Sequence, residues 1–326
     1  MAHANRSESL VILHISDLHI APHKLEDVQV VLRAFWKDLD RLAEKPGFSP
    51  DLICFTGDIA QAGKEGEFEL AAEHLFDPLL ERFGLERERL LWVPGNHDVD
   101  RKAVNDMDEW ALQSRKSPHD IDKTLRDDIN RKRALKRLDA YAQFTRAYFG
   151  DVLDGQDPAY FTTRTLTIKG HTIGVACLNS AWRCSSDEDK GRLWIGDTQL
   201  RNALEQIQDA DMKLALLHHP FDWLHENEQE TAEDFCLREF DLVLRGHLHK
   251  SKVAYKRGPD GDNLILPTGA LFQWRHWEGY SWIQIAQDHA RIHLRQFVAK
   301  RDCFVPDNTI ADDGVWEIEG SYPNFR

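Results

Sequence analysis

The sequence lacks the cysteine pattern of a disulfide framework or of a structural zinc site. Its five cysteines are an odd number and none belongs to a Cys-x-x-Cys pair, whereas both kinds of site use paired thiols. Long apolar runs are also missing, since none approaches the ~18 residues that a membrane-spanning helix needs. Residues 1–9 are polar and show no apolar stretch of a secretory signal. We therefore expect a cytoplasmic protein without a membrane segment.

Basic residues are in the minority, with 41 Lys and Arg against 55 Asp and Glu and a net charge of −14. This balance disfavours a general nucleic-acid binder, because affinity for phosphates comes mainly from Lys and Arg. One local basic run interrupts it, at Arg131, Lys132, Arg133, Lys136 and Arg137. Acidic residues flank that run at helical spacing, which favours a solvated face of ion pairs over a nucleic-acid surface.

The chain has 326 residues, of which 42% are hydrophobic and 29% charged, so it is globular. Its first hundred residues alternate apolar strands with amphipathic helices, which predicts a sheet covered on both faces. The expected strands are 10–15, 52–55 and 90–93, and the expected helices are 27–42 and 67–83. Residues 100–150 interrupt this alternation as a charged, helical insertion that lies over one edge of the core.

The second half of the chain is predicted to continue with strands. A hairpin is expected at 161–168 and 172–178, followed by helix 197–208, strand 213–217, helix 233–239 and strand 241–244. Short strands are expected at 252–256, 263–266, 281–286 and 290–294. We expect one domain over residues 1–300 and an irregular tail over 301–326.

Polar side chains with ligand chemistry follow five of the predicted strands directly. They are Asp17 and His19, Asp58, Asn96-His97-Asp98, His218-His219, and His247 with His249. Strand ends of an α/β sheet converge on one crevice, where ligands bind. Imidazole, carboxylate and amide groups without thiolates suit Zn, Mn or Fe. Such a set is too large for one tetrahedral ion but suffices for two divalent ions that share a carboxylate.

These motifs together resemble the signature of the calcineurin-like metallophosphoesterases over residues 10–290. The resemblance implies a four-layer αββα sandwich, with two sheets packed face to face and helices outside. It implies that Asp17, His19, Asp58 and His249 hold a first metal and that Asp58, Asn96, His218 and His247 hold a second. It also implies that His97 faces the substrate as proton donor or charge stabiliser, and that Asp98 orients His97.

His219 follows a ligand directly, and two roles are open for it. It either contacts the substrate, together with Asn96 and His97, or supports the ligands by a hydrogen bond. The segment from Thr56 to Gly63, with Leu178-Asn179-Ser180 further on, is similar to the class III cyclic-nucleotide phosphodiesterases. The resemblance therefore favours hydrolysis of phosphodiesters, nucleotides or cyclic nucleotides preferred, by a hydroxide held between two metals.

Two other functions remain open at this point. A DNA or RNA nuclease would use the insertion as a clamp, and a binding or scaffold module would keep the fold without catalysis. The cluster Trp274, His276, Trp277 and Tyr280 either stacks on a base or packs on the sheet edge. Trp182, Arg183 and Trp194 are weighed as a rim of the site, with packing favoured. The sequence leaves the oligomeric state and the native metal undetermined.

Overall fold

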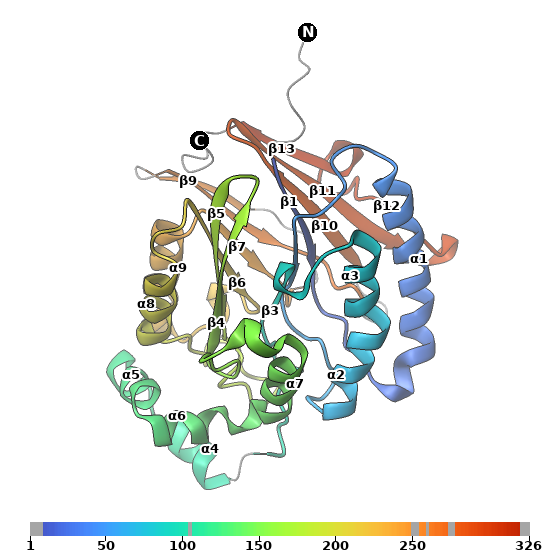
Figure 1. Cartoon of the computed structure of the whole chain (residues 1–326). Helices are drawn as coiled ribbons and strands as arrows, with labels where there is room; N and C mark the ends of the chain where they lie inside the picture. The colour runs from blue at the N-terminus through green and yellow to red at the C-terminus, as the bar shows by residue number, and fades with distance from the viewer. Residues whose placement is uncertain (1–8, 104–105, 249–253, 259–260, 273–277, 320–326) are drawn as a thin grey trace.

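The computed structural model describes residues 9–103, 106–248, 254–258, 261–272 and 278–319, without the side chains of 254–258 and 261–263. Two mixed sheets form its centre (Figure 1). The first sheet contains β1 Leu10–Ile15, β2 Leu52–Phe55, β3 Leu90–Trp92, β10 Gly279–Ile285, β11 His289–Val298, β12 Cys303–Pro306 and β13 Val315–Glu319. The second contains β4 Phe161–Ile168, β5 His171–Leu178, β6 Met212–Leu217, β7 Leu242–Arg245, β8 Ala254–Gly258 and β9 Gly261–Pro267.

Alternation along the strands explains why the sheets pack face to face. In β1, Leu10 and Ile12 lie in a buried cluster with Leu214 and Leu216 of β6. Leu13 and its odd-numbered neighbours belong instead to a cluster shared with the helices. Side chains point alternately to the two faces of a strand, so each sheet buries one face on the other sheet and one face under helices. The fold is therefore the expected four-layer αββα sandwich.

Helices form the two outer layers and the insertion. On the first sheet lie α1 Leu25–Ala43, α2 Glu65–Ala71 and α3 Asp77–Phe83, and on the second lie α8 Asp197–Gln206 and α9 Glu226–Glu239 (Figure 1). A π-helical turn at Ala72–Phe76 joins α2 to α3, so the expected helix 67–83 is continuous but not uniform. Among the described residues no helix combines the length and apolar character needed to cross a membrane.

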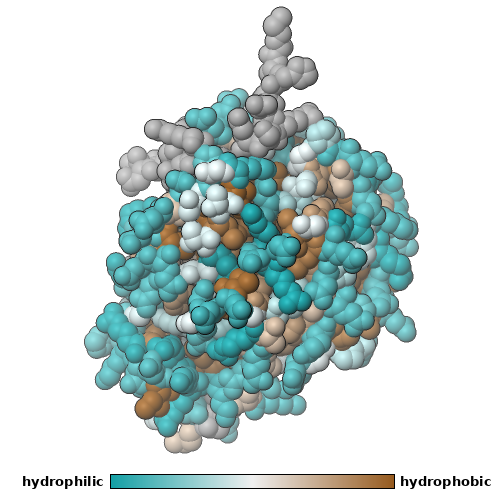
Figure 2. Space-filling view, in the orientation of Figure 1, coloured by the Kyte–Doolittle hydropathy of each residue, from teal (hydrophilic) through white to brown (hydrophobic). Residues whose placement is uncertain are grey.

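The insertion consists of α4 Asp106–Gln113, α5 Pro118–Arg126, α6 Asp128–Leu135 and α7 Asp139–Phe149. Its last helix covers the edge of the first sheet, because Trp92 of the edge strand β3 packs on Phe144 and Phe149, with ring centroids 5.6 and 4.4 Å away. The face in Figure 2 is mostly hydrophilic, with a small apolar patch over the insertion. Large apolar side chains exposed on these helices are Met107, Trp110 and Ile129.

The predicted solvated face on the basic run is wrong for Arg137. This residue is buried, and its guanidinium donates to Glu109 at 2.5 Å and to the Cys184 carbonyl at 2.6 Å. Arg131 follows the prediction more closely, since it pairs with Asp128 at 2.5 Å on a partly exposed surface. A charged side chain was expected to be solvated, yet a buried guanidinium is stable here because a carboxylate and a carbonyl satisfy it.

The irregular tail expected after residue 300 is also wrong. β12 and β13 both pair antiparallel with β11, through Phe297↔Phe304 and Ile292↔Trp316. Phe304 is buried and packs on Phe35 of α1. Both strands are short, β12 ends at Pro306 and β13 carries Glu317 and Glu319, so neither shows a clear strand pattern in the sequence. Two other expected elements shift: the helix expected at 233–239 begins at Glu226, and the strand expected at 252–256 is β8.

Candidate metal centre

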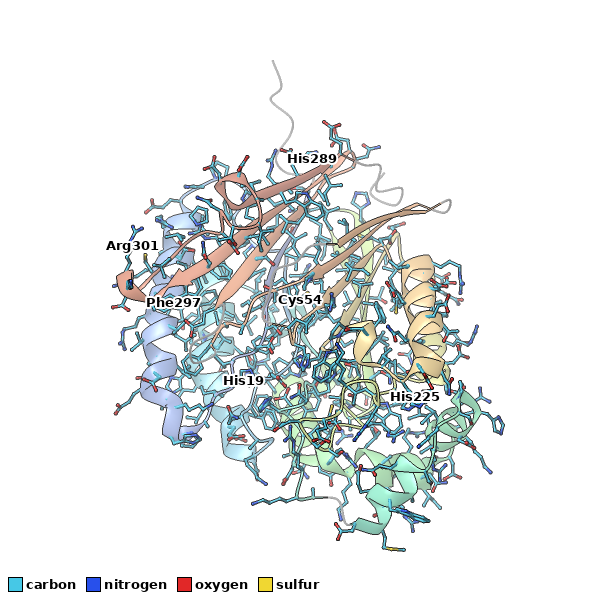
Figure 3. The ribbon with its side chains drawn as sticks, turned by 180° about the vertical axis from the view of Figure 1, so that it is seen from behind. His19, Cys54, His225, His289, Phe297 and Arg301 are labelled. Carbon is cyan, nitrogen blue, oxygen red and sulfur yellow. The ribbon has the colours of Figure 1, made fainter. Side chains whose placement is uncertain are left out.

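Five strands from both sheets deliver the candidate ligands to one end of the molecule. β1, β2 and β3 run parallel in the first sheet, and β6 and β7 run parallel in the second. Their carboxyl ends therefore lie at the same edge, as the sequence predicts. Figure 3 shows His19 at this end, which faces the insertion. The centre thus spans the junction between the sheets.

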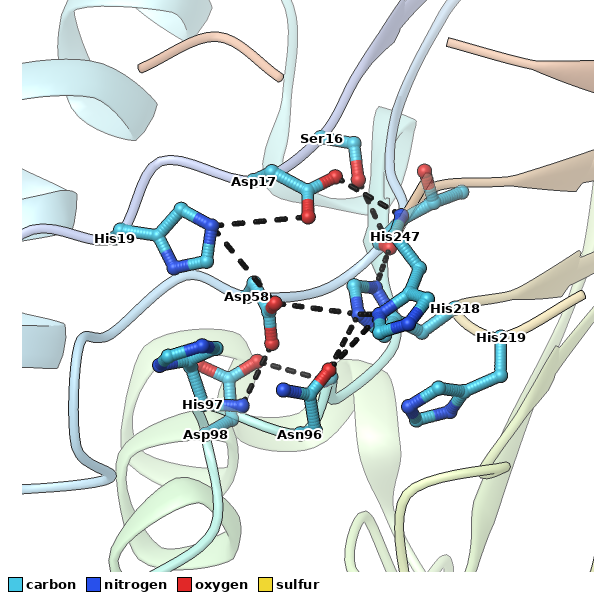
Figure 4. A network of polar contacts seen from close by, with 12 residues as sticks. Ser16, Asp17, His19, Asp58, Asn96, His97, Asp98, His218, His219 and His247 are labelled. Atoms are coloured by element: carbon cyan, nitrogen blue, oxygen red, sulfur yellow. Dashed lines mark hydrogen bonds and ion pairs between the residues drawn. The ribbon is translucent and has the colours of Figure 1, made fainter. Parts of the chain in front are cut away.

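Asp58 lies in the middle of the cluster (Figure 4). Its Oδ2 atom is 3.9 Å from His19 Nε2 on one side and 3.3 Å from His218 Nε2 on the other. The Oδ1 atom of Asp17 lies 3.8 Å from the same His19 nitrogen. The Asp58 carboxylate is buried, and its Oδ1 atom accepts a hydrogen bond from the His97 backbone amide at 2.7 Å. The Asp58 carboxylate thus lies between two sets of potential ligand atoms.

A second set of donors converges beside Asp58. Asn96 Oδ1 lies 3.1 Å from His218 Nε2 and 3.0 Å from His247 Nδ1, and the two ring nitrogens are 3.2 Å apart. The backbone amide of His247 donates to Asp17 Oδ2 at 3.2 Å. An amide oxygen and two imidazole nitrogens therefore face one small volume, which is the chemistry of a site for a divalent cation.

The chain itself fixes which nitrogen of His218 faces this volume. His218 Nδ1 lies 2.7 Å from the Thr56 carbonyl, to which only a protonated ring nitrogen can donate, so Nε2 is left toward Asp58 and Asn96. Ligand histidines commonly donate their other N–H in this way. Burial alone would lower the pKa of His218, but the Asp58 carboxylate overrides burial and raises it to about 9. The Asp58 carboxylate thus favours the protonated, positively charged form of His218.

The pKa of Asp58 is shifted in the opposite direction to that of His218. Its burial opposes ionisation, but the charges of His218, His97 and His19 hold the pKa of Asp58 well below its usual range. The carboxylate is therefore ionised at neutral pH and is available to share its two oxygens between cations.

Four of the candidate ligands have a left-handed backbone conformation, which residues other than glycine rarely adopt. Asp17, His19, Asp58 and His247 have φ values of 56°, 47°, 58° and 70°. Left-handed conformations cost about 1–3 kcal/mol each for residues other than glycine, and they concentrate at functional sites. All four lie in the turns that follow β1, β2 and β7. Sequence analysis missed this feature, for which no residue pattern gives a signal.

Neighbouring glycines make room for these side chains. A Cβ atom at Gly95 would lie 2.2 Å from Asp58 Oδ1, and one at Gly57 would lie 2.5 Å from His218 Nδ1. Gly57 also has a φ of 92°, which only glycine adopts readily. The Gly-Asp and Gly-Asn pairs of the motifs therefore have a steric reason, since any side chain at the glycine would displace a ligand.

His97 occupies the rim of the cluster and is partly exposed. Its ring lies edge-on to that of His19, with centroids 4.6 Å apart, and its Nδ1 atom is 2.8 Å from the Gln61 carbonyl. Asp98 was expected to orient this ring. Its buried carboxylate instead accepts from the backbone amides of Ala60 at 2.7 Å, Gly95 at 2.8 Å and Ile59 at 3.2 Å. Asp98 therefore holds the turn that carries His97, and Gln61 contacts the ring.

His219 is within reach of the cluster but is engaged elsewhere. Together with His218 and His247 it forms a group whose nitrogens lie within 4.8 Å of one another. The His219 ring is buried, however, with Nδ1 3.0 Å from Ser180 Oγ and Nε2 3.7 Å from Cys184 Sγ. These contacts favour the supporting role over contact with substrate.

The aromatic residues expected at a rim or a stacking loop lie in the interior where the structure describes them. Trp182 and Trp194 are buried, so they belong to the core and not to a rim. The Tyr280 hydroxyl donates to Asp38 at 2.6 Å in the interior, which favours packing for this residue. His249, Trp274, His276 and Trp277 lie outside the described residues.

Buried His14 contacts Thr56, which in turn contacts His218, and the sequence analysis did not identify it. Its Nε2 atom is 3.0 Å from the Thr56 hydroxyl, and the Thr56 carbonyl is the partner of His218. Burial lowers the pKa of His14 to about 3, against a smaller opposing effect of Asp17, so the ring is neutral. A histidine in mid-strand, next to the Asp17 motif, was the available signal.

The described residues fit a metal centre. Three groups with mutually close ligand atoms occur, namely Asp17-Asp58-His218, His19-Asp58-His97 and His218-His219-His247. Two of them share Asp58. Oxygen and imidazole nitrogen donors, an ionised central carboxylate and oriented histidine tautomers are what divalent Mn, Fe or Zn require.

Comparison with known proteins agrees with this chemistry. The chain belongs to the calcineurin-like phosphoesterase family, whose model matches residues 10–251. It is 24% identical to the uncharacterized metallophosphoesterase-like protein YydB of Bacillus subtilis, over 80% of this chain and 53% of that protein. The chain therefore spans about half the length of this relative.

A shorter match concerns a cAMP/cGMP dual specificity phosphodiesterase of Mycobacterium tuberculosis. It is 36% identical over 94 residues, which are 27% of each protein. Among solved structures, a dimetal phosphatase from Danio rerio has a TM-score of 0.51 at 11% identity, covering 88% of this chain and 96% of that one. At this identity the likeness establishes the fold alone.

Proposed function

We propose that this protein is a dinuclear, metal-dependent phosphoesterase that acts on phosphodiesters, with nucleotides or cyclic nucleotides preferred. The observation that carries the proposal is the place of the buried Asp58 carboxylate between His19 and His218. Asp17, His19 and Asp58, with His249 from outside the described residues, would hold one metal. Asp58, Asn96, His218 and His247 would hold the other.

Bound divalent metals would neutralise charge on the phosphoryl oxygens. They would also lower the pKa of a bound water molecule, so that hydroxide is available at neutral pH. The residues of the chain supply the rest. His97 lies at the exposed side of the cluster, where its Nε2 atom can transfer a proton to a departing oxygen while Nδ1 is held by the Gln61 carbonyl. The hydrogen bonds of Asp98 keep that turn in place.

The preference for diesters follows from charge. A phosphate monoester carries one more negative charge than a diester near neutral pH, and the five strand-end motifs contain neither Lys nor Arg after the strand itself. The 36% identical segment shared with a cyclic-nucleotide phosphodiesterase is consistent with this preference. A nuclease gains less support, because Arg137 of the basic run is buried against Glu109.

The test is a panel assay with added Mn²⁺. It compares bis-p-nitrophenyl phosphate, p-nitrophenyl phosphate, cyclic nucleotides and single-stranded DNA, and elemental analysis of the reconstituted protein runs in parallel. We expect about two equivalents of metal per chain and faster cleavage of the diester than of the monoester. Faster cleavage of p-nitrophenyl phosphate would overturn the diester preference, and fewer than two metals at saturation would overturn the dinuclear assignment.

A further inference from the structure

A lysine from outside the motifs lies beside His97. Lys24 ends the short 3-10 turn Pro22–Lys24, which follows the loop of Asp17 and His19. It is half-buried, and its Nζ atom donates to Gln61 Oε1 at 2.5 Å. Gln61 in turn lies against the His97 ring, with Nε2 3.3 Å and the backbone carbonyl 2.8 Å from Nδ1. One amide group thus separates the Lys24 ammonium from the proposed proton donor.

The partner of this ammonium is a neutral amide. Burial lowers the pKa of Lys24, while the charge of Glu67 opposes the effect. The Glu67 carboxylate itself accepts from the backbone amides of Ala62 and Lys64, at 2.9 and 3.1 Å. Lys64 provides a contrast on the same rim, since its ammonium is paired with Asp100 at 2.6 Å. An amide is a weaker partner for a cation than an anionic oxygen is, so Lys24 has more to gain from an anion than Lys64 has.

We propose that the Lys24 ammonium exchanges its hydrogen bond to Gln61 for one to a phosphoryl oxygen of the substrate. Lys24 thereby sets the rate of monoester hydrolysis relative to diester hydrolysis. The inference rests on the proposed phosphoesterase function. The lysine stem is flexible and its ammonium is a compact charge, so the exchange needs only rotamer changes at the rim. The second negative charge of a monoester interacts with Lys24, and a diester, which lacks that charge, depends on it less.

The experiment compares kcat/KM for two substrates with the same leaving group, p-nitrophenyl phosphate and bis-p-nitrophenyl phosphate. In Lys24→Met we expect kcat/KM for the monoester to fall about 10- to 100-fold, the range for a charged hydrogen bond, and that for the diester to fall less than about threefold. Lys24→Arg should retain most of the monoester activity. Lys64→Met is the matched control and should leave kcat/KM unchanged for both substrates.

An equal fall on both substrates would overturn the proposal, since it would mean that Lys24 only supports Gln61 and His97. An unchanged ratio with unchanged activity would overturn it as well. Calorimetric titration of the metal-loaded protein with inorganic phosphate provides a readout without turnover, and Lys24→Met should weaken binding about tenfold. If the wild-type protein cleaves neither ester, the proposed function fails, and this titration alone still decides the role of Lys24.

Discussion

At the scale of single residues, Asp58 is the most constrained side chain of the centre. It combines a left-handed backbone, complete burial and contacts with both sets of donors. Asp58→Asn keeps the shape but removes the charge that would offset repulsion between the two proposed metal ions. We expect the variant to bind fewer than two metals and to lose most activity while keeping the fold, as measured by elemental analysis, turnover and circular dichroism. Two bound metals with wild-type turnover would show that Asp58 does not bridge.

His97 offers a second test, which separates chemistry from metal binding. In His97→Ala the metals should stay bound, because Asn96 and not His97 faces His218 and His247. Turnover should fall by about 10²–10⁴, the usual effect of losing a general acid. A p-nitrophenolate leaves without a proton and a sugar alkoxide needs one, so the loss should be mild on the aryl diester and severe on a nucleotide diester. Equal losses would assign His97 to charge stabilisation, and loss of metal would make it a ligand.

At the scale of elements, Glu228 couples α9 to the beginning of α8. Its carboxylate is buried and accepts from the backbone amides of Ile195 and Gly196, at 2.8 and 2.6 Å. Burial raises the pKa of Glu228 to about 7, although these hydrogen bonds oppose it. Between pH 4.5 and 7 the folded state therefore binds more protons than the unfolded state, and stability falls as pH rises through this window.

The expected contribution is about 3 kcal/mol, from a shift between the ordinary glutamate value and about 7. Urea unfolding of wild type and Glu228→Gln at pH 4.5 and pH 8 measures it. Between pH 4.5 and pH 8 the free energy of unfolding of the wild type should fall by about 3 kcal/mol relative to that of Glu228→Gln. Glu230→Gln, at an exposed position of the same helix, is the control and should show no such change. A difference between wild type and Glu228→Gln that is independent of pH would refute the assignment.

At the scale of the whole molecule, the sequence predicts more of the sandwich than of its borders. Continuous apolar strands such as Leu52–Phe55 are recognisable because both of their faces are buried, and their ends then locate Asp58 and His218. Cys303–Pro306 and Val315–Glu319 escaped because they are short edge elements without a clear apolar run, and they become strands by pairing with β11. Tertiary contact, and not local pattern, decides such strands.

The centre shows the same division. Residue types and strand ends predict which side chains gather, because parallel strands must end at one edge. They do not predict the left-handed φ values of Asp17 and His247, nor that Asp98 bonds to backbone amides instead of the His97 ring. Those features depend on atoms from separate loops meeting within hydrogen-bond distance. Lys24 was invisible for the same reason, since only the folded chain brings it to Gln61.

The order in which the ribosome delivers this chain gives the two-sheet centre a further consequence. β1 pairs with β2 on one side and with β10 on the other, through Leu10↔Ile285 and Leu13↔Trp282. Asp17, His19, Asp58 and Asn96 are synthesised early, but β1 remains an unprotected edge until residue 285 has emerged. His218 and His247 follow much later along the chain than Asn96. A nascent chain that has not reached His247 carries only part of the candidate ligand set on an open sheet, so the proposed pair of metals would be held only after His218 and His247 have emerged.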